Sequence, residues 1–92
     1  MTWTDEQVRG ALGGEADRAV AAAEAVAAAA GFPGDALDDD GREWAETHGV
    51  PPDDLVEAAL RRIRDLCAQE ADAATIAGLR NLRYRLGDAL AR

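Results

Sequence analysis

Apolar residues recur at three- and four-residue spacing along most of this chain, which is the pattern of amphipathic helices that bury one face. Glycine, proline and aspartate clusters separate these stretches. The pattern predicts helices over residues 5–12, 15–30 and 41–48, from Pro52 to about Gln69, and over the final segment 75–92. No run of alternating apolar and polar residues suggests a strand.

The first predicted helix has a complete start signal in "TWTDEQV". Thr4 is the expected N-cap, Gln7 its capping-box partner, and Trp3 is placed to pack on Val8. Gly13 and Gly14 end this helix, or act as the hinge of one kinked element.

The second predicted helix is built almost entirely from alanine. Its expected buried stripe comprises Ala16, Val20, Ala23, Ala27 and Ala30. Gly31 is the expected left-handed cap, with Phe32 folding back and Pro33 preventing continuation.

The stretch "DDDGREWAETHG" raises the question of a calcium loop. With Gly41 at the sixth position of an EF-hand loop, Asp38 and Asp40 fall at positions three and five, but Ala36 falls at one and Thr47 at twelve. The two essential ends are therefore missing, and a helix cap fits better. Asp40 is the expected N-cap and Glu43 its capping-box partner. Asp38 and Asp39 add negative charge near the positive end of the helix dipole, where it is stabilising.

This short helix is expected to end at Gly49, with Val50 closing back on Trp44 or Ala45. Pro52 suits the first position of the next helix. The apolar face of that helix is expected to comprise Val56, Ala59, Leu60, Ile63, Leu66 and Cys67, and a charge ladder of Glu57, Arg61 and Asp65 lies on its outside. The apolar phase changes over residues 69–74, which predicts a turn capped by Asp72 or, alternatively, one long helix.

The final segment has a near-heptad seam of Ile76, Leu79, Leu82, Leu86 and Ala89 or Leu90. Arg80, Arg83 and Arg85 flank this seam, which predicts either core packing or an oligomer contact. The expected fold is all-α: one domain over residues 1–92, a compact alanine-rich bundle of four to five short helices. Because 22 of the 92 residues are alanine, the core is thin, and a homodimer through the C-terminal helix would cover more surface.

Charge is unevenly distributed along the chain. Residues 1–57 hold 14 acids and 3 arginines, whereas residues 58–92 hold 4 acids and 7 arginines, for a net charge of −8. Such a balance makes nucleic-acid binding unfavourable and favours a partner protein with a basic surface. General solubility, a GC-rich genome or a high-salt habitat explains the acidity equally well. The segment at Met1 has no signal-peptide pattern and no stretch is long and apolar enough to span a membrane, so a cytoplasmic location is expected.

The chemistry of the residue types argues against an enzyme. The sequence has no serine and no lysine, which excludes serine nucleophiles, Schiff bases and the phosphate-binding P-loop. His48 and Cys67 are single residues of their kind, too few for a zinc site, and His48 is better explained as a dipole partner at a helix C-terminus. No cofactor or metal is expected.

The favoured hypothesis is a protein-interaction module. An acidic face of this protein would dock on a basic surface of a partner protein. If the partner binds nucleic acid, the carboxylates of the acidic face would take the place of the phosphates. Small acidic inhibitors carried by phages have this size and charge. The residues of this face are Asp38, Asp39, Asp40, Glu43, Glu46, Asp53 and Asp54. Trp44 is an aromatic anchor if its helix faces outward and a core residue if it faces inward.

The alternative is a homodimeric DNA-binding regulator that uses Arg80, Arg83 and Arg85. Residues 42–63, "REWAETHGVPPDDLVEAALRRI", resemble the helix, Gly-Val turn and second helix of ribbon-helix-helix repressors. Those families place a basic strand before the first helix, whereas "FPGDALDDD" at 32–40 contains a proline and no basic residue. The element that would read DNA is therefore missing.

Overall fold

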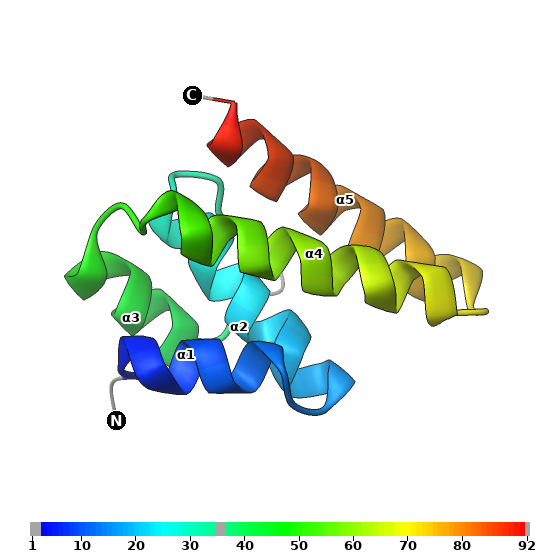
Figure 1. Ribbon diagram of the computed structural model, residues 1–92, viewed down its shortest axis with the longest axis horizontal. Helices are drawn as coiled ribbons and strands as arrows, with labels where there is room; N and C mark the ends of the chain where they lie inside the picture. Colours follow the sequence, from blue (N-terminus) through cyan, green and yellow to red (C-terminus); the bar gives the residue numbers. More distant parts are fainter. Residues whose placement is uncertain (1–2, 35–36, 92) are drawn as a thin grey trace.

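The computed structural model describes residues 3–34 and 37–91, and every regular element in them is a helix (Figure 1). The helices are α1 (Asp5–Leu12), α2 (Ala16–Ala29), α3 (Asp39–His48), α4 (Asp53–Gln69) and α5 (Ala73–Leu90). The Cα radius of gyration is 11.7 Å, near the value of about 12 Å for a compact domain of this length. The prediction of an all-α bundle is confirmed. Asp35 and Ala36 of the predicted 31–40 loop lie outside the described residues.

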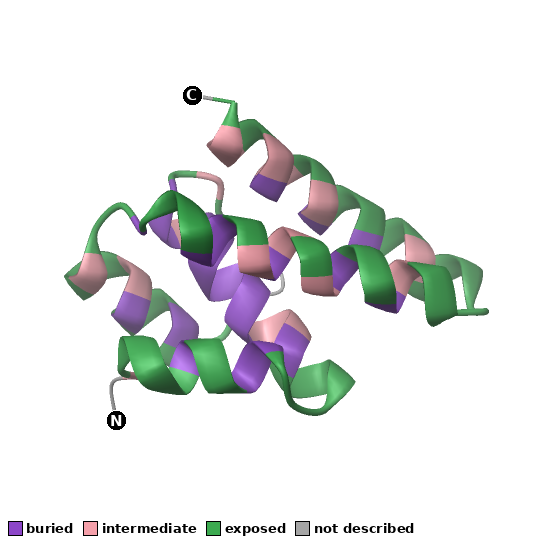
Figure 2. Ribbon diagram, viewed as in Figure 1, coloured by how far each residue is buried: buried purple, intermediate pink, exposed green. Residues whose placement is uncertain are grey.

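Helix α2 lies at the centre and contacts each of the other four helices. Figure 2 shows it buried along most of its length. The residues of α2 with no exposed surface are Ala19, Ala22, Ala23, Ala25, Val26 and Ala27. The predicted stripe is confirmed at Ala23, Ala27 and Ala30 but is wrong at Ala16, which is exposed, and at Val20, which is only partly buried. Single-methyl side chains allow neighbours to approach closely from several sides, so the middle of α2, from Ala22 to Ala27, is buried all round.

Both ends of the first helical hairpin follow the expected chemistry. Thr4 and Gln7 form the capping box, with bonds of 3.2 and 2.9 Å. Helix α1 ends at Leu12 and α2 begins at Ala16, so the alternative of one kinked helix is excluded. At the other end of α2, Gly31 has φ 99° and Phe32 N–H donates to the Ala27 carbonyl at 2.9 Å, which is the predicted left-handed cap.

The start of α3 corrects the prediction of an Asp40 cap. The cap is Asp38, whose Oδ1 accepts a 2.7 Å hydrogen bond from Gly41 N–H, so Asp39 and Asp40 belong to the first helical turn. Gly41 explains the register. It is buried, and a Cβ there would lie 3.3 Å from the Cβ of Ala25, so this turn packs directly on α2.

The end of α3 also differs from the prediction. Gly49 does have a positive φ of 78°, but Val50 is 81% exposed and does not close back on the helix. The next residue, Pro51, is buried. Pro52 then precedes α4 as its N-cap, and is not its first helical residue.

Helices α4 and α5 form an antiparallel hairpin (Figure 1). The predicted turn is confirmed and the single long helix excluded, because α4 ends at Gln69 and Asp72 caps α5 by accepting from Thr75 N–H at 2.9 Å. Leu79, Leu82 and Leu86 bury the predicted seam. The described hydrophobic core takes residues from all five helices. None of these helices has the length and apolar character needed to cross a membrane.

Candidate functional site

The predicted acidic face is divided between α3 and the start of α4. Asp38, Asp39 and Asp40 are exposed at the N-terminus of α3. The positive end of the helix dipole stabilises carboxylates at this position, and Asp38 also satisfies one backbone N–H. This part of the face is therefore a consequence of how α3 begins.

Glu43 and Glu46 lie one turn apart on α3 and are exposed, whereas Trp44 between them is 2% exposed. The buried indole fixes which side of α3 faces the core, and so directs the two glutamates outward. Trp44 is thus a core residue, and the alternative of an outward aromatic anchor is excluded.

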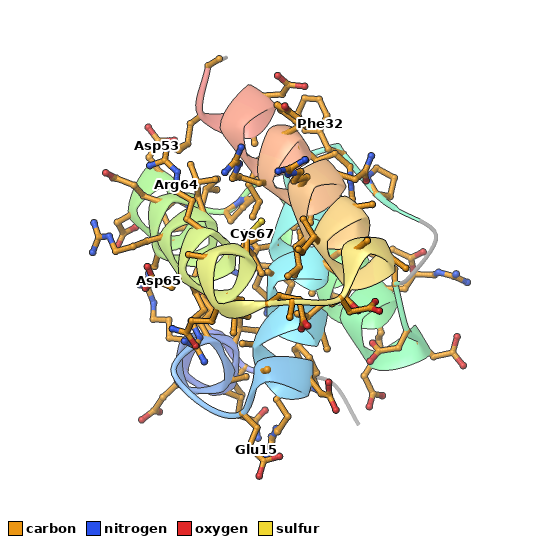
Figure 3. The ribbon with its side chains drawn as sticks, turned by 90° about the vertical axis from the view of Figure 1, so that its right-hand side faces the viewer. Glu15, Phe32, Asp53, Arg64, Asp65 and Cys67 are labelled. Carbon is orange, nitrogen blue, oxygen red and sulfur yellow. The ribbon has the colours of Figure 1, made fainter. Side chains whose placement is uncertain are left out.

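Asp53 and Asp54 occupy the first turn of α4 and are exposed. Figure 3 shows Asp53 pointing away from the helices. Asp54 differs, because Arg9 of α1 donates to it at 3.2 Å. Both side chains are largely exposed, so this ion pair contributes little to stability and leaves Asp54 accessible.

His48 joins α3 to α1. Its Nε2 lies 2.8 and 2.9 Å from the two carboxylate oxygens of Asp5, and its ring stacks on Trp44 with centroids 4.6 Å apart. The hydrogen bond to Asp5 raises the pKa of His48 above 6.5, and the same bond lowers the pKa of Asp5 below 3.8. The sequence placed His48 correctly at a helix C-terminus but did not reveal this partner.

A buried ion pair joins α2 to α5. Glu24 is 4% exposed, and Arg85 donates to its two carboxylate oxygens at 2.8 and 3.0 Å. Arg85 also donates to the Phe32 carbonyl at 3.3 Å and to Asn81 Oδ1 at 2.8 Å. Gly34 lies against this guanidinium, because a Cβ there would be 2.5 Å from Nη1.

The three arginines predicted as a contact surface are placed differently from one another. Arg80 is exposed, Arg83 is partly buried with its guanidinium 5.8 Å from the ring centre of Tyr84, and Arg85 points inward to Glu24. Tyr84 is 65% exposed. The outer side of α5 therefore offers two arginines and a tyrosine, not three arginines.

His48 and Cys67, considered from the sequence for a zinc site, have separate surroundings. Both ring nitrogens of His48 are engaged, by Asp5 and by the Gly49 carbonyl at 3.3 Å. Cys67 is partly buried and lies between α4 and α5 (Figure 3). Among residues 3–34 and 37–91, no three histidine, cysteine or acidic side chains are grouped closely enough to hold a metal ion.

Surface hollows lie along several of the helix contacts. One of about 310 Å³ lies between α1 and α4 and contains Arg9, Arg61, Arg62 and Asp65. Two others, of about 280 and 260 Å³, adjoin between α2 and α5 and share Asp17, Val20, Thr75 and Leu79. These three hollows were not predictable from the sequence, because each is lined by helices that lie far apart in the chain.

No protein-family model, curated protein or solved structure matches this chain.

Proposed function

We propose that this protein is a helical interaction module that docks its acidic face on a basic surface of another protein. The observation that supports this most is the arrangement of α3. Trp44 locks one side of the helix into the core while five carboxylates remain exposed on the rest of it: Asp38, Asp39, Asp40, Glu43 and Glu46.

Electrostatics supports the same proposal. In the described part of the chain, no salt bridge joins Asp39, Asp40 or Asp53 to a cation. Their charge is available to a partner, and a concentrated negative field accelerates association with a positive surface. Such a face could replace the phosphates of a nucleic acid on a nucleic-acid-binding partner, which would make the module an inhibitor by occupancy.

The alternative, a DNA-binding regulator, has less support. On α5, Arg85 is held by Glu24, which leaves Arg80 and Arg83 to meet phosphates. The exposed Arg61 and Arg64 of α4 are also available, but on a chain of net charge −8. The described residues include no strand that could precede α3 as in ribbon-helix-helix repressors.

Affinity capture from lysate of the source cells tests the proposal. The bait is wild-type protein beside Asp38→Asn/Asp39→Asn/Asp40→Asn, with Glu57→Gln/Asp65→Asn/Asp88→Asn as the control of equal charge change on exposed sites elsewhere. We expect basic proteins to be retained by the wild type and the control, lost by the α3 variant, and released by salt. Equal capture by both variants, or binding of wild type to duplex DNA at low salt, would overturn it.

A further inference from the structure

The two adjoining hollows between α2 and α5 form one groove, because they share lining residues on both helices. Thr75 and Leu82 mark its extent along α5, seven residues or about 10 Å of helix. The Glu24–Arg85 pair closes one end, and Gln69 and Glu70 before the α4–α5 turn close the other.

The floor of the groove is apolar and its rim is acidic. Val20, Leu66, Leu79 and Leu82 supply the floor. The charged residues that line it are Asp17, Glu24 and Glu70, and no basic side chain of the described residues lines either hollow. Since Arg85 neutralises Glu24, the rim charge that a ligand meets comes from Asp17 and Glu70.

Gly78 keeps one wall of the groove open. A glycine within a helix costs about 1 kcal/mol relative to alanine. Internal packing does not require it here, since a Cβ at Gly78 would meet nothing within 4 Å. The missing side chain instead allows another chain to approach the backbone of α5.

We infer that this groove binds a basic amphipathic helical segment of a partner protein. Two apolar side chains one turn apart enter the two hollows, and lysine or arginine residues beside them meet Asp17 and Glu70. One helical turn rises about 5.4 Å, so such a pair fits within the length of the groove. A second copy of this chain, with a net charge of −8, matches this acidic rim less well than a basic helix does. The inference goes beyond the proposed function, because it uses none of the α3 carboxylates.

Fluorescence anisotropy tests the inference with a labelled synthetic helix of about fourteen residues, or four turns. It carries leucines at i and i+4 on one face and lysines elsewhere. A peptide of the same composition in scrambled order and one with glutamate for lysine serve as comparisons. We expect the scrambled peptide to bind about tenfold more weakly and the acidic peptide not to bind.

Gly78→Leu fills the groove and should weaken binding of the leucine-lysine helix about tenfold or more. Gly10→Leu is the matched control: it also lies in a helix with nothing within 4 Å of its Cβ, and it should bind as wild type does. Circular dichroism verifies that both variants remain helical. Asp17→Asn/Glu70→Gln should weaken binding about tenfold.

Unchanged binding by Gly78→Leu, or equal binding of the scrambled peptide, would overturn the inference. The inference would also be overturned if Asp38→Asn/Asp39→Asn/Asp40→Asn lost peptide binding while the groove variants kept it. That result would instead support the proposed acidic face. Conversely, retained peptide binding by that variant, together with loss in Gly78→Leu, would support the groove whatever the lysate capture shows.

Discussion

Arg85 meets Glu24 across 61 residues of sequence in a fork of two hydrogen bonds, from the last turns of α5 to the middle of α2. The carboxylate is nearly inaccessible, whereas the arginine side chain keeps 16% exposure. The ion pair therefore holds the C-terminal helix on the central helix through one defined geometry. Removing one partner should be far more damaging than replacing both.

Arg85→Met should lower the free energy of unfolding by about 3 kcal/mol, because Glu24 stays buried without its cation. Glu24→Leu/Arg85→Met should recover most of that loss. Urea denaturation of the single and double variants measures both values. If the loss of unfolding free energy in the double variant equalled the sum of the losses in Arg85→Met and Glu24→Leu, the ion pair would not act as described.

Gly34→Ala should destabilise the fold by about 1–3 kcal/mol through displacement of the Arg85 guanidinium, which lies 2.5 Å from the position of the new Cβ. The same substitution in an Arg85→Met background should cost little, since the obstructing group is gone. Gly87→Ala is the control: its Cβ meets nothing within 4 Å, and the variant should gain up to about 1 kcal/mol of helix stability. Equal losses from Gly34→Ala in both backgrounds would be inconsistent with this contact.

The Asp5–His48 pair should stabilise the fold most between about pH 3.8 and 6.5, and its contribution should decrease on both sides of this range. The pKa of His48 is raised by Asp5, so its contribution is complete below pH 6.5 and is lost as the pH rises through the higher folded value. The pKa of Asp5 is lowered, so its contribution is complete above pH 3.8 and is lost as the pH falls through the lower folded value.

Proton NMR of the single imidazole measures this coupling directly. We expect a His48 pKa above 6.5 in the wild type and a decrease in Asp5→Asn, because the hydrogen-bonding carboxylate is removed. Chemical denaturation at several pH values should show wild type losing stability as the pH rises above 6.5 and Asp5→Asn losing less. An unchanged imidazole titration in Asp5→Asn would rule out the pairing.

Capping by Asp38 should be separable from its charge. Asp38→Ala should cost about 1 kcal/mol, because the Gly41 N–H loses its acceptor, whereas Asp38→Asn should cost little. Asp39→Ala, one residue further into the helix, controls for the loss of a carboxylate near the dipole. Thermal unfolding ranks the three variants. If Asp39→Ala proved the most destabilised, the assignment of the cap would be wrong.

Helix α2 should not accept larger side chains. Ala22→Leu should destabilise the protein by about 1–3 kcal/mol, since Ala22 has no exposed surface and neighbours on every side. Ala68→Leu, at an exposed position of α4, should be neutral. Differential scanning calorimetry of both variants provides the comparison, and equal melting temperatures would refute close packing around α2.

Local chemistry made much of this fold predictable. Thr4, Gly31 and Asp72 act through groups within a few residues, so their caps could be read from the sequence. Which of the three successive aspartates caps α3 could not be read from the sequence, because each of them can act as an N-cap. The close contact of Gly41 with α2 decides the register.

The pairing of Glu24 with Arg85 was not predictable for a related reason. A single acid in an alanine run looks like a marker of the solvent face, and only the tertiary arrangement shows that the part of α2 around Glu24 is buried on all sides. The same applies to His48, whose neighbour Asp5 lies 43 residues away. The α3 carboxylates were predicted to be exposed and are, but only the structure shows that Trp44 faces the core.

The alanine packing around α2 restricts how this molecule could acquire a new activity. An interior filled by methyl groups has no volume to spare, so evolution could not hollow out a chamber for a small molecule without separating several helices at once. Novel recognition would have to arise from substitutions on the outside, where α3 and the α2–α5 groove can change without disturbing the centre.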